Sequence, residues 1–509
     1  MVRIRTRIND KFSLEFKIWY ARPKGEACAA GDSAAGSVKS CVENGGKSVS
    51  EYRLENWVFV PATLDINALT YNREQFYSDI TNYYRTITPA YSLKEIAYGQ
   101  PGSVSGSKIS YNPEACGPLG YLSNAVYNII NYPTDENVAE YEYQIKMFCA
   151  IYKSAVRERY DQLKGNITAE GLESLAKDAF TVLENYGQVL DCLKDNVKAA
   201  VYNYCSFGEE FIINLTQSYS YKLYGKDSTN RQLVDWLVKL GKYKSQRGYS
   251  VLNEDKPMKN ANLLYRWSVL KKYVESDLYL SADRRKNGVL QEQVYYSIAA
   301  GLSMVFATAM TFTFQQKYGN YTMPLFVALV VSYMLKDRIK ELVRSAFSSN
   351  RKLKYFDNKT RLSVKDNIIG VCKEGFDIVP QSKVPQEIID IRNRSMIVDV
   401  ENRINQESVL FYRNLVEVDH SKLAGTSEYS VEGINEILIL NLSSFVKKMD
   451  NPENGYHICK PDGEMVSVSV KKIYYINFIC RISYDDQVLC KRYRIAMNRD
   501  GIIDLETLR

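Results

Sequence analysis

The chain has 509 residues, which is enough for about three or four domains. Its net charge of +7 is modest for that length and does not mark a nucleic-acid-binding protein, while its 40 tyrosines supply ample surface for buried cores. With only two histidines, His420 and His457, the sequence excludes a histidine-rich metal site, and we expect neither a metal nor a cofactor.

The first segment, residues 1–113, is expected to be a small α+β domain. Alternating apolar residues predict a strand at Phe12–Tyr20, and Tyr52–Val60 is typical of a second strand. Asn72 has the side chain of a helix N-cap, so we expect a helix from there to about Tyr84.

Two stretches rich in small residues, Gly25–Ser50 and Gly99–Lys108, are expected to be flexible linkers. Within the first, Cys41–Ser48 ends in Gly-Lys-Ser like a phosphate-binding loop. However, its first glycine is replaced by Cys41, no strand precedes it and no apolar helix follows it. The sequence therefore predicts no nucleotide site in either stretch.

Residues 114–292 are expected to form a helical domain. Apolar residues recur at steps of three or four over Ile145–Leu163 and again over Leu172–Val197. This is the pattern of amphipathic helices that pack on a core. A polar stretch, Gly225–Asn260, interrupts the pattern before it resumes.

The middle of the chain, residues 293–335, contains two long runs without a charge. As a helix, Val294–Phe314 spans about 31 Å, close to the ~30 Å hydrocarbon core of a bilayer, and Tyr321–Leu335 spans about 22 Å. The polar break Gln315–Asn320 separates the runs, so the pattern predicts a two-helix transmembrane hairpin. The alternative is a helical pair buried in a soluble core, although soluble helices rarely run about 20 residues without a charge.

Small residues recur along the first of these runs. Ser297 and Gly301, and likewise Ser303 and Ala307, lie four residues apart and would let another helix approach closely within a bilayer. That helix belongs either to the second run of the same chain or to a second copy. The hydroxyl groups of the run, such as that of Thr308, are expected to bond to their own helix, which makes them tolerable in lipid.

Basic residues flank the expected hairpin on both outer sides. Lys336, Arg338, Lys340 and Arg344 follow the second run on an amphipathic helix expected over residues 336–354, and they are expected to contact the inner leaflet. Docking of that helix on the chain's own domains is the alternative. Because the connecting loop carries one charge only, the positive-inside tendency predicts that both termini lie in the cytosol.

The last segment, residues 355–509, is expected to be a second α+β domain. Its predicted elements are short strands at Ile368–Val371 and Phe376–Val379, a helix over Val431–Met449, and an antiparallel meander from Val466–Ile482 and Gln487–Met497. The predicted fold class is α+β: a mainly helical cytosolic region, small β-containing N- and C-terminal domains, and the central transmembrane hairpin.

Ten cysteines are scattered along the chain without a Cys-x-x-Cys pair. Cys149 and Cys480 lie in apolar patterns, so buried, reduced thiols are expected rather than a disulfide framework.

Several stretches resemble an uncharacterised group of bacterial membrane proteins with two central spans. They are Ala307-Thr308-Ala309, Pro324–Glu341, Tyr493-Arg494-Ile495 and Asn498–Ile502. The resemblance is strongest over the C-terminal part of the chain. It implies a bacterial cytoplasmic (inner) membrane, and it carries neither an activity nor a catalytic residue.

Together these features predict a membrane-anchored cytosolic scaffold or sensor without enzymatic activity, whose partners are the lipid bilayer and either a second copy or another protein. A membrane-associated enzyme with a dispersed active site is the first alternative, and an oligomerising membrane-perturbing effector is the second. No pair of carboxylates stands out in the sequence as a general acid and base.

Overall fold

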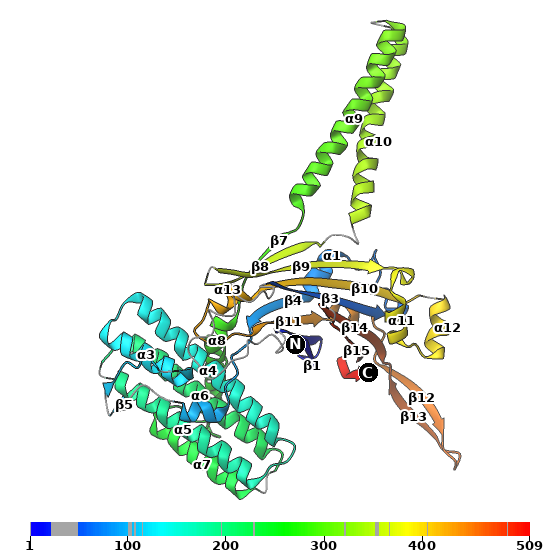
Figure 1. Cartoon of the computed structure of the whole chain (residues 1–509). Helices are drawn as coiled ribbons and strands as arrows, with labels where there is room; N and C mark the ends of the chain where they lie inside the picture. The colour runs from blue at the N-terminus through cyan, green and yellow to red at the C-terminus, as the bar shows by residue number, and fades with distance from the viewer. Residues whose placement is uncertain are drawn as a thin grey trace. The chain divides into compact units, whose positions relative to one another are not determined.

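The computed structural model in Figure 1 has an α+β fold, as the sequence predicts. It describes residues 2–21, 49–99, 104–105, 108–114, 116–194, 196–227, 230–319, 322–351, 356–365, 367–404, 406–485 and 487–508. The expected linker at Gly25–Ser50 lies outside the described residues up to position 48, and with it the phosphate-loop-like Cys41–Ser48. Much of the second linker, Gly99–Lys108, also lies outside them.

The chain folds into two compact units, and neither is a continuous stretch of sequence. Unit 1 consists of Met1–Tyr84, Ser281–Thr426 and Gly433–Arg509, and unit 2 of Arg85–Leu280 and Ser427–Glu432. The segments 1–113 and 355–509, expected as separate terminal domains, both contribute to unit 1, because their strands pair within one sheet.

Unit 1 contains an eight-stranded sheet whose neighbouring strands are antiparallel. In order, its strands are β16 (Gly501–Leu508), β15 (Gln487–Asn498), β14 (Tyr474–Tyr484), β3 (Val49–Val60), β10 (Ser408–Asp419), β9 (Asn367–Val379), β8 (Asn358–Val364) and β7 (Ser281–Lys286). The predicted strand at Tyr52–Val60 is confirmed, and β14, β15 and β16 form a C-terminal meander. The strand expected over Val466–Ile482 is two strands, however, because residues 466–471 belong to a separate ribbon. The two short strands expected at Ile368–Val371 and Phe376–Val379 are one continuous strand, β9.

A smaller, four-stranded sheet packs face to face on the large one. Its strands are β1 (Val2–Ile8), β2 (Ser13–Ala21), β11 (Gly433–Asn441) and β4 (Ile80–Thr86), in that order. Phe16 of β2 stacks on Phe478 of β14 with 4.2 Å between the ring centroids, and the ring of Tyr20 lies 5.0 Å from that of Tyr52 on β3. Buried aromatic side chains therefore fill the space between the sheets.

The helix predicted over Val431–Met449 is wrong, because residues 433–441 form strand β11 and only the short α14 (Ser443–Val446) is helical. Ile434, Glu436 and Leu438 alternate toward the core, and all three are buried. A carboxylate in the middle of the buried face breaks the apolar alternation by which a strand is usually recognised.

The helix expected from Asn72 to about Tyr84 is shorter than predicted. Asn72 is its N-cap, as expected, and accepts a hydrogen bond from the backbone N–H of Gln75 at 2.8 Å. The helix, α1 (Arg73–Asp79), then ends where the β-branched Ile80 begins strand β4.

Unit 2 is helical, as predicted. Its long helices are α3 (Gly117–Asn131), α4 (Asp135–Leu163), α5 (Ala169–Leu193), α6 (Ala199–Tyr224), α7 (Arg231–Gln246) and α8 (Pro257–Glu275). The predicted apolar faces are confirmed, since Phe148, Tyr152 and Tyr186 are fully buried in one core. The predicted helical segment extends too far at its C-terminal end, because residues 281–286 form the edge strand β7 of unit 1.

A buried carboxylate connects two helices inside unit 2. Glu209 on α6 accepts hydrogen bonds from Arg247 Nε and Tyr249 Oη, both at 2.7 Å, and from Tyr243 Oη of α7 at 3.2 Å. Because these donors satisfy both oxygens, hydrogen bonding within unit 2 accounts for the burial of this carboxylate.

Two short helices and a two-stranded ribbon also belong to unit 1. Helix α11 (Gln386–Arg392) contributes Ile388 to a cluster on the large sheet, where Trp57 stacks on Phe411 at 4.0 Å. Helix α12 (Met396–Ile404) follows it, and β12 (Glu453–Cys459) pairs with β13 (Met465–Lys471) as a separate two-stranded ribbon.

Candidate functional site

Two long helices, α9 (Val289–Tyr318) and α10 (Met323–Arg351), are inserted between neighbouring strands of the large sheet (Figure 1). Strand β7 leads into α9, and α10 leads back into β8. At the base of the insertion, Lys286 pairs with Asn358, and the backbone N–H of Asn287 donates to the carbonyl of Asp357 at 2.8 Å. The paired strands therefore hold the two ends of the insertion side by side.

The two helices pack against each other through small side chains. Among the side chains that the structure describes on the two helices, Ala299 and Ser303 of α9 and Ala328 and Ser332 of α10 are buried. Small residues at a helical interface allow the two backbones to approach closely. Of the two alternatives for the small residues of the first run, this arrangement matches packing on the second run of the same chain.

The structure separates the four small residues that the sequence singles out. Ser303 is buried and Ala307 is half-buried in the helix pair, whereas Ser297 and Gly301 are exposed. A Cβ atom added to Gly301 would meet no atom within 4 Å. Only half of the predicted packing face is therefore used within the chain.

The hydroxyl groups of α9 bond to their own helix, as predicted. Each donates to a backbone carbonyl three or four residues earlier, at 2.8–2.9 Å. The donors are Ser297, Ser303, Thr308, Thr311 and Thr313. These side chains consequently need no polar partner outside the helix.

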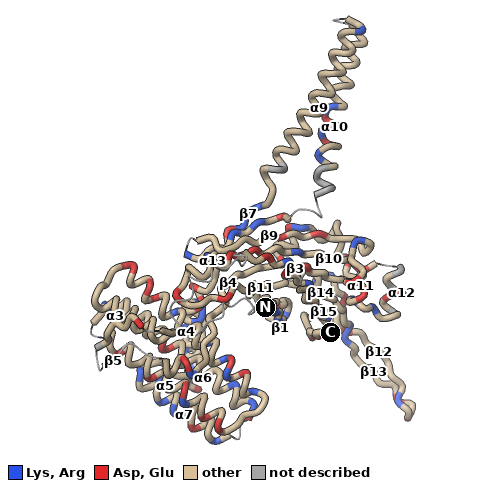
Figure 2. Tube along the Cα trace, in the orientation of Figure 1, with Lys and Arg blue, Asp and Glu red and all other residues tan. Residues whose placement is uncertain are grey.

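Both helices expose large apolar side chains on the faces that point away from the partner helix. Phe312 is 65% exposed and Phe326 61%, and the runs around them carry no charge (Figure 2). Among the described helices, one is long and apolar enough to cross a membrane: α9 over Gln293–Tyr318, 26 residues with a mean hydropathy of 1.5. The second expected span, Tyr321–Leu335, stays a prediction.

A cation–π contact shows the register of the two helices. The guanidinium group of Arg344 lies 4.1 Å from the ring centroid of Tyr296. Since both helices rise about 1.5 Å per residue, Lys336 lies level with about Met304. The segment that the helices share without a charge, up to Lys317 at the tip, is thus Met323–Leu335 beside the second half of α9, about 20 Å long.

The four basic residues expected at the inner leaflet all lie on α10 beyond this shared segment. Lys336 has its ammonium group 4.1 Å from the Tyr333 ring centroid, and Arg344 also pairs with Glu341 at 3.3 Å. Arg338 and Lys340 lie between them. The helix expected over residues 336–354 is therefore, as far as Arg351, the second half of α10 rather than a separate element, and residues 352–354 lie outside the described residues.

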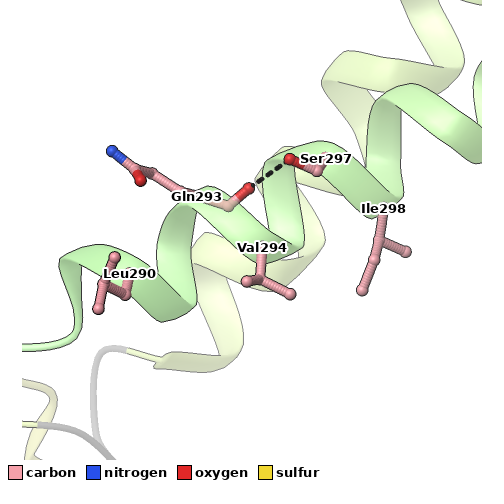
Figure 3. A pocket seen from close by; sticks show the side chains of 5 residues that line it. All are labelled: Leu290, Gln293, Val294, Ser297 and Ile298. Carbon is pink, nitrogen blue, oxygen red and sulfur yellow. Dashed lines mark hydrogen bonds between the residues drawn. The ribbon is translucent and has the colours of Figure 1, made fainter.

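The first turns of α9 carry a shallow, open depression (Figure 3). It is lined by Leu290, Gln293, Val294, Ser297 and Ile298. Leu290, Val294 and Ile298 point to the same side of the helix, while the Ser297 hydroxyl turns back to the Gln293 carbonyl at 2.9 Å. An apolar lining without an acid or base suits a packing contact rather than a reaction.

A second candidate lies between the two sheets of unit 1, where polar side chains form a buried network. Glu436 of β11 is fully buried and accepts hydrogen bonds from Tyr20 Oη at 2.6 Å, Asn414 Nδ2 at 2.9 Å and Tyr84 Oη at 3.2 Å. The Tyr84 hydroxyl also lies 3.0 Å from Cys372 Sγ. Strands from both sheets thus meet at this carboxylate.

Glu374 of β9 is the second buried carboxylate of the network. Arg284 Nη2 of β7 donates to it at 2.7 Å, and Asn82 Nδ2 of β4 donates at 2.6 Å. Asn82 Nδ2 also lies 2.7 Å from Tyr412 Oη. Through Arg284 the network reaches the strand that leads into α9.

The two carboxylates differ in how their charge is compensated. Glu374 has the cation Arg284, whereas the donors to Glu436 are neutral. Burial raises the pKa of Glu436 to about 7, and the nearby charge of Glu374 adds to this, while the hydrogen bonds from Tyr20, Tyr84 and Asn414 act in the opposite direction. Glu436 therefore holds its proton over part of the neutral pH range.

The sequence reasoning missed this network. Its members come from strands far apart in the chain, and only strand pairing and the packing of the two sheets bring them together. The one available signal was Glu436 itself, a carboxylate within the apolar run from Ile434 to Leu440. Since both carboxylates are buried, no substrate could contact them unless the sheets separated.

Other candidate groups are dispersed. Within the described ranges, no three His, Cys, Asp or Glu side chains come together as a metal site would require. His420 Nε2 lies 3.0 Å from Ser50 Oγ at the start of the short α13 (His420–Ala424), and His457 lies on the exposed β12 ribbon. Cys149 and Cys480 are buried thiols, as predicted.

Comparisons of the chain with protein-family models, with curated proteins and with solved structures find no match.

Proposed function

We propose that the chain is a membrane-anchored protein whose α9–α10 pair enters a lipid bilayer as a two-helix hairpin and keeps both compact units on one side. There the units would act as a scaffold or sensor rather than as an enzyme. The observation that carries this proposal is the exposed apolar surface of both helices along their shared uncharged segment.

Lipid is the environment that this surface fits best. A soluble protein rarely exposes a large contiguous apolar patch, and transfer of one large apolar side chain out of water is worth about 1.5–3 kcal/mol. Phe312, Phe326 and Met334 are each more than half exposed. The hydroxyl groups of α9 donate to carbonyls of their own helix, which removes the main polar cost of moving this helix into hydrocarbon.

The shared uncharged segment, about 20 Å long, is shorter than a hydrocarbon core of about 30 Å. Lys336 and Arg338 can extend their ammonium and guanidinium groups to the headgroups while their stems remain in the apolar layer. Lys340 and Arg344 would then lie among or beyond anionic headgroups of the inner leaflet. We place both termini in the cytosol because of the charge asymmetry around the two helices. We take the membrane to be the bacterial inner membrane because of the resemblance that includes the second run.

Neither alternative function is favoured by a specific contact. An enzyme would need a site that substrate can reach, and the perturbed carboxylate Glu436 is fully buried between the sheets. A membrane-perturbing effector would need the small-residue face for assembly, yet Ser303 and Ala307 already pack within the chain.

Membrane fractionation tests the anchor. We expect the full chain to remain in the membrane pellet after a carbonate wash, and the variant with Phe312→Glu and Val330→Glu, both exposed in the shared segment, to be released. Leu342→Glu, in the charged half of α10, and Leu69→Glu, on an exposed turn of unit 1, are matched controls that should stay in the pellet. A wild-type chain that is soluble after lysis without detergent would refute the proposal.

Labelling of the helix tip tests the two-span form. With Lys317→Cys we expect a membrane-impermeant maleimide to label the tip from outside intact cells. The exposed native Cys459 should be labelled only after permeabilisation. A tip that is protected from both sides would mean that the hairpin enters the bilayer without crossing it.

A further inference from the structure

We propose that the first half of α9 carries a seam for a second copy of this chain. The seam, here called the α9 stripe, consists of Leu290, Val294, Ile298, Gly301 and Leu302. This inference rests on the proposed membrane anchor, because the anchor would place the two copies parallel and side by side.

The α9 stripe occupies one face of the helix. Its members follow at steps of three and four residues, and this face lies opposite Ala299 and Ser303, which pack on α10. Leu290 is 78% exposed and Leu302 54%. Figure 3 shows Leu290, Val294 and Ile298 on one side of α9, along the open depression of its first turns.

The register of the helix pair indicates that lipid tails do not cover the lower part of this stripe. Because Arg344 stacks on Tyr296, the part of α10 beside the stripe is its charged half. That half carries Asp337 and Glu341 as well as its basic residues, and charged side chains of both signs are costly in hydrocarbon. The lower part of the stripe, from Leu290 to Ile298, therefore lies at or below the headgroups, where its apolar side chains face water unless a protein covers them.

A second copy fits the stripe in charge and in shape. The stripe carries no charge, so two copies can face each other without repulsion. The open space at Gly301 allows the close backbone approach that small residues permit between helices.

The size of the stripe is also sufficient. Its exposed side chains, with the adjoining Val305, offer roughly 500 Å² per copy, so a symmetric pair would bury about 1,000 Å², the lower limit of a specific interface. Confinement to one membrane raises the effective concentration of the copies and thereby supports an interface of this size.

Disulfide cross-linking on membranes tests the seam in the full-length protein. Under mild oxidation we expect Gly301→Cys to give a dimer band well above that of the wild-type chain, whose own cysteines set the background. Ala300→Cys is the matched control, because residue 300 is exposed on α9 at the same level but off the stripe. Equal dimer yields from the two variants would overturn the proposal.

Charge insertion provides the second measurement. In nanodiscs, Val294→Lys with Ile298→Lys should weaken dimerisation at least about tenfold, while Gln293→Lys with Ala300→Lys, which adds the same charge off the stripe, should not. A wild-type chain that is membrane-bound but monomeric would refute the seam and leave the anchor intact. Release of the stripe variant from vesicles would identify lipid as the occupant and also refute the seam. A wild-type chain that binds no vesicles would instead refute the anchor itself.

Discussion

The guanidinium group of Arg344 on α10 lies 4.1 Å from the ring centroid of Tyr296 on α9. This contact aligns the charged half of α10 with the first turns of α9 and the apolar half of α10 with the second half of α9. The helix pair therefore has two parts with different surfaces. The distal part exposes large apolar side chains, and the proximal part presents an apolar stripe of α9 next to charges of both signs.

Packing of α9 on α10 should depend on the small size of Ser303. We expect Ser303→Leu to destabilise the pair by roughly 1–3 kcal/mol, because a longer side chain overfills a buried contact. Hydrogen–deuterium exchange of α9 and α10 peptides in detergent should then be about tenfold faster. Thr308→Leu makes a comparable change on the exposed side of α9 and should leave exchange unaltered. Equal effects of both variants would contradict the observed packing.

The ion pair between Arg284 and Glu374 should stabilise unit 1. Arg284→Met leaves the buried carboxylate without its cation, and we expect unfolding free energy to fall by roughly 1–3 kcal/mol in chemical denaturation. Glu374→Gln in the same chain should restore part of the loss. The neighbouring Arg285→Met removes only the exposed pair with Asp283 and should change stability by less than about 0.5 kcal/mol. No difference between the two arginine variants would refute this role.

Stability should fall with rising pH through the titration of Glu436. Its pKa is about 7 in the folded protein and 4.5 is its ordinary value, so the unfolded chain loses this proton first as pH rises. The contribution of this proton to the free energy of unfolding is complete below about pH 4.5 and declines up to about pH 7. Above about pH 7 it no longer changes. The total change is on the order of 3 kcal/mol.

Denaturation of wild type and Glu436→Gln at several pH values measures this effect. We expect the variant to lose this part of the pH dependence, because its amide does not titrate. Glu51→Gln, on the partly exposed Arg53–Glu51 pair, should behave as wild type. A pH profile that Glu436→Gln leaves unchanged would show that the carboxyl does not titrate in this range.

In unit 2, Gly208 is required for the approach of α6 to α5. A Cβ atom at position 208 would lie 2.1 Å from Tyr186 Oη, so we expect Gly208→Ala to lower stability by about 1–3 kcal/mol. Removal of the hydroxyl by Tyr186→Phe should recover part of this loss, although it also removes the bond to the Cys205 carbonyl at 3.1 Å. Gly241→Ala, where a Cβ atom meets nothing within 4 Å, should be neutral or stabilising. Thermal melts followed by circular dichroism distinguish these outcomes.

The sequence alone determined the local structure of this protein wherever side-chain periodicity was clear. The amphipathic helices of unit 2, strand β2, the C-terminal meander and the self-bonded hydroxyls of α9 all depend on neighbours within a few residues. It also identified the charge asymmetry around α9 and α10. It failed at β11, because Glu436 occupies a core position that a strand pattern assigns to an apolar residue.

Only the tertiary structure decided which distant segments meet. Pairing of β3 with β10 and β14 joins the two ends of the chain in one sheet. The packing of the smaller sheet on this sheet brings Glu374 of β9 and Glu436 of β11 into one network. The stacking of Arg344 on Tyr296 likewise depends on helix register, which side-chain pattern does not encode. The physical reason is that a strand or helix buries its apolar face equally well against many partners, and loop closure and packing select the partner.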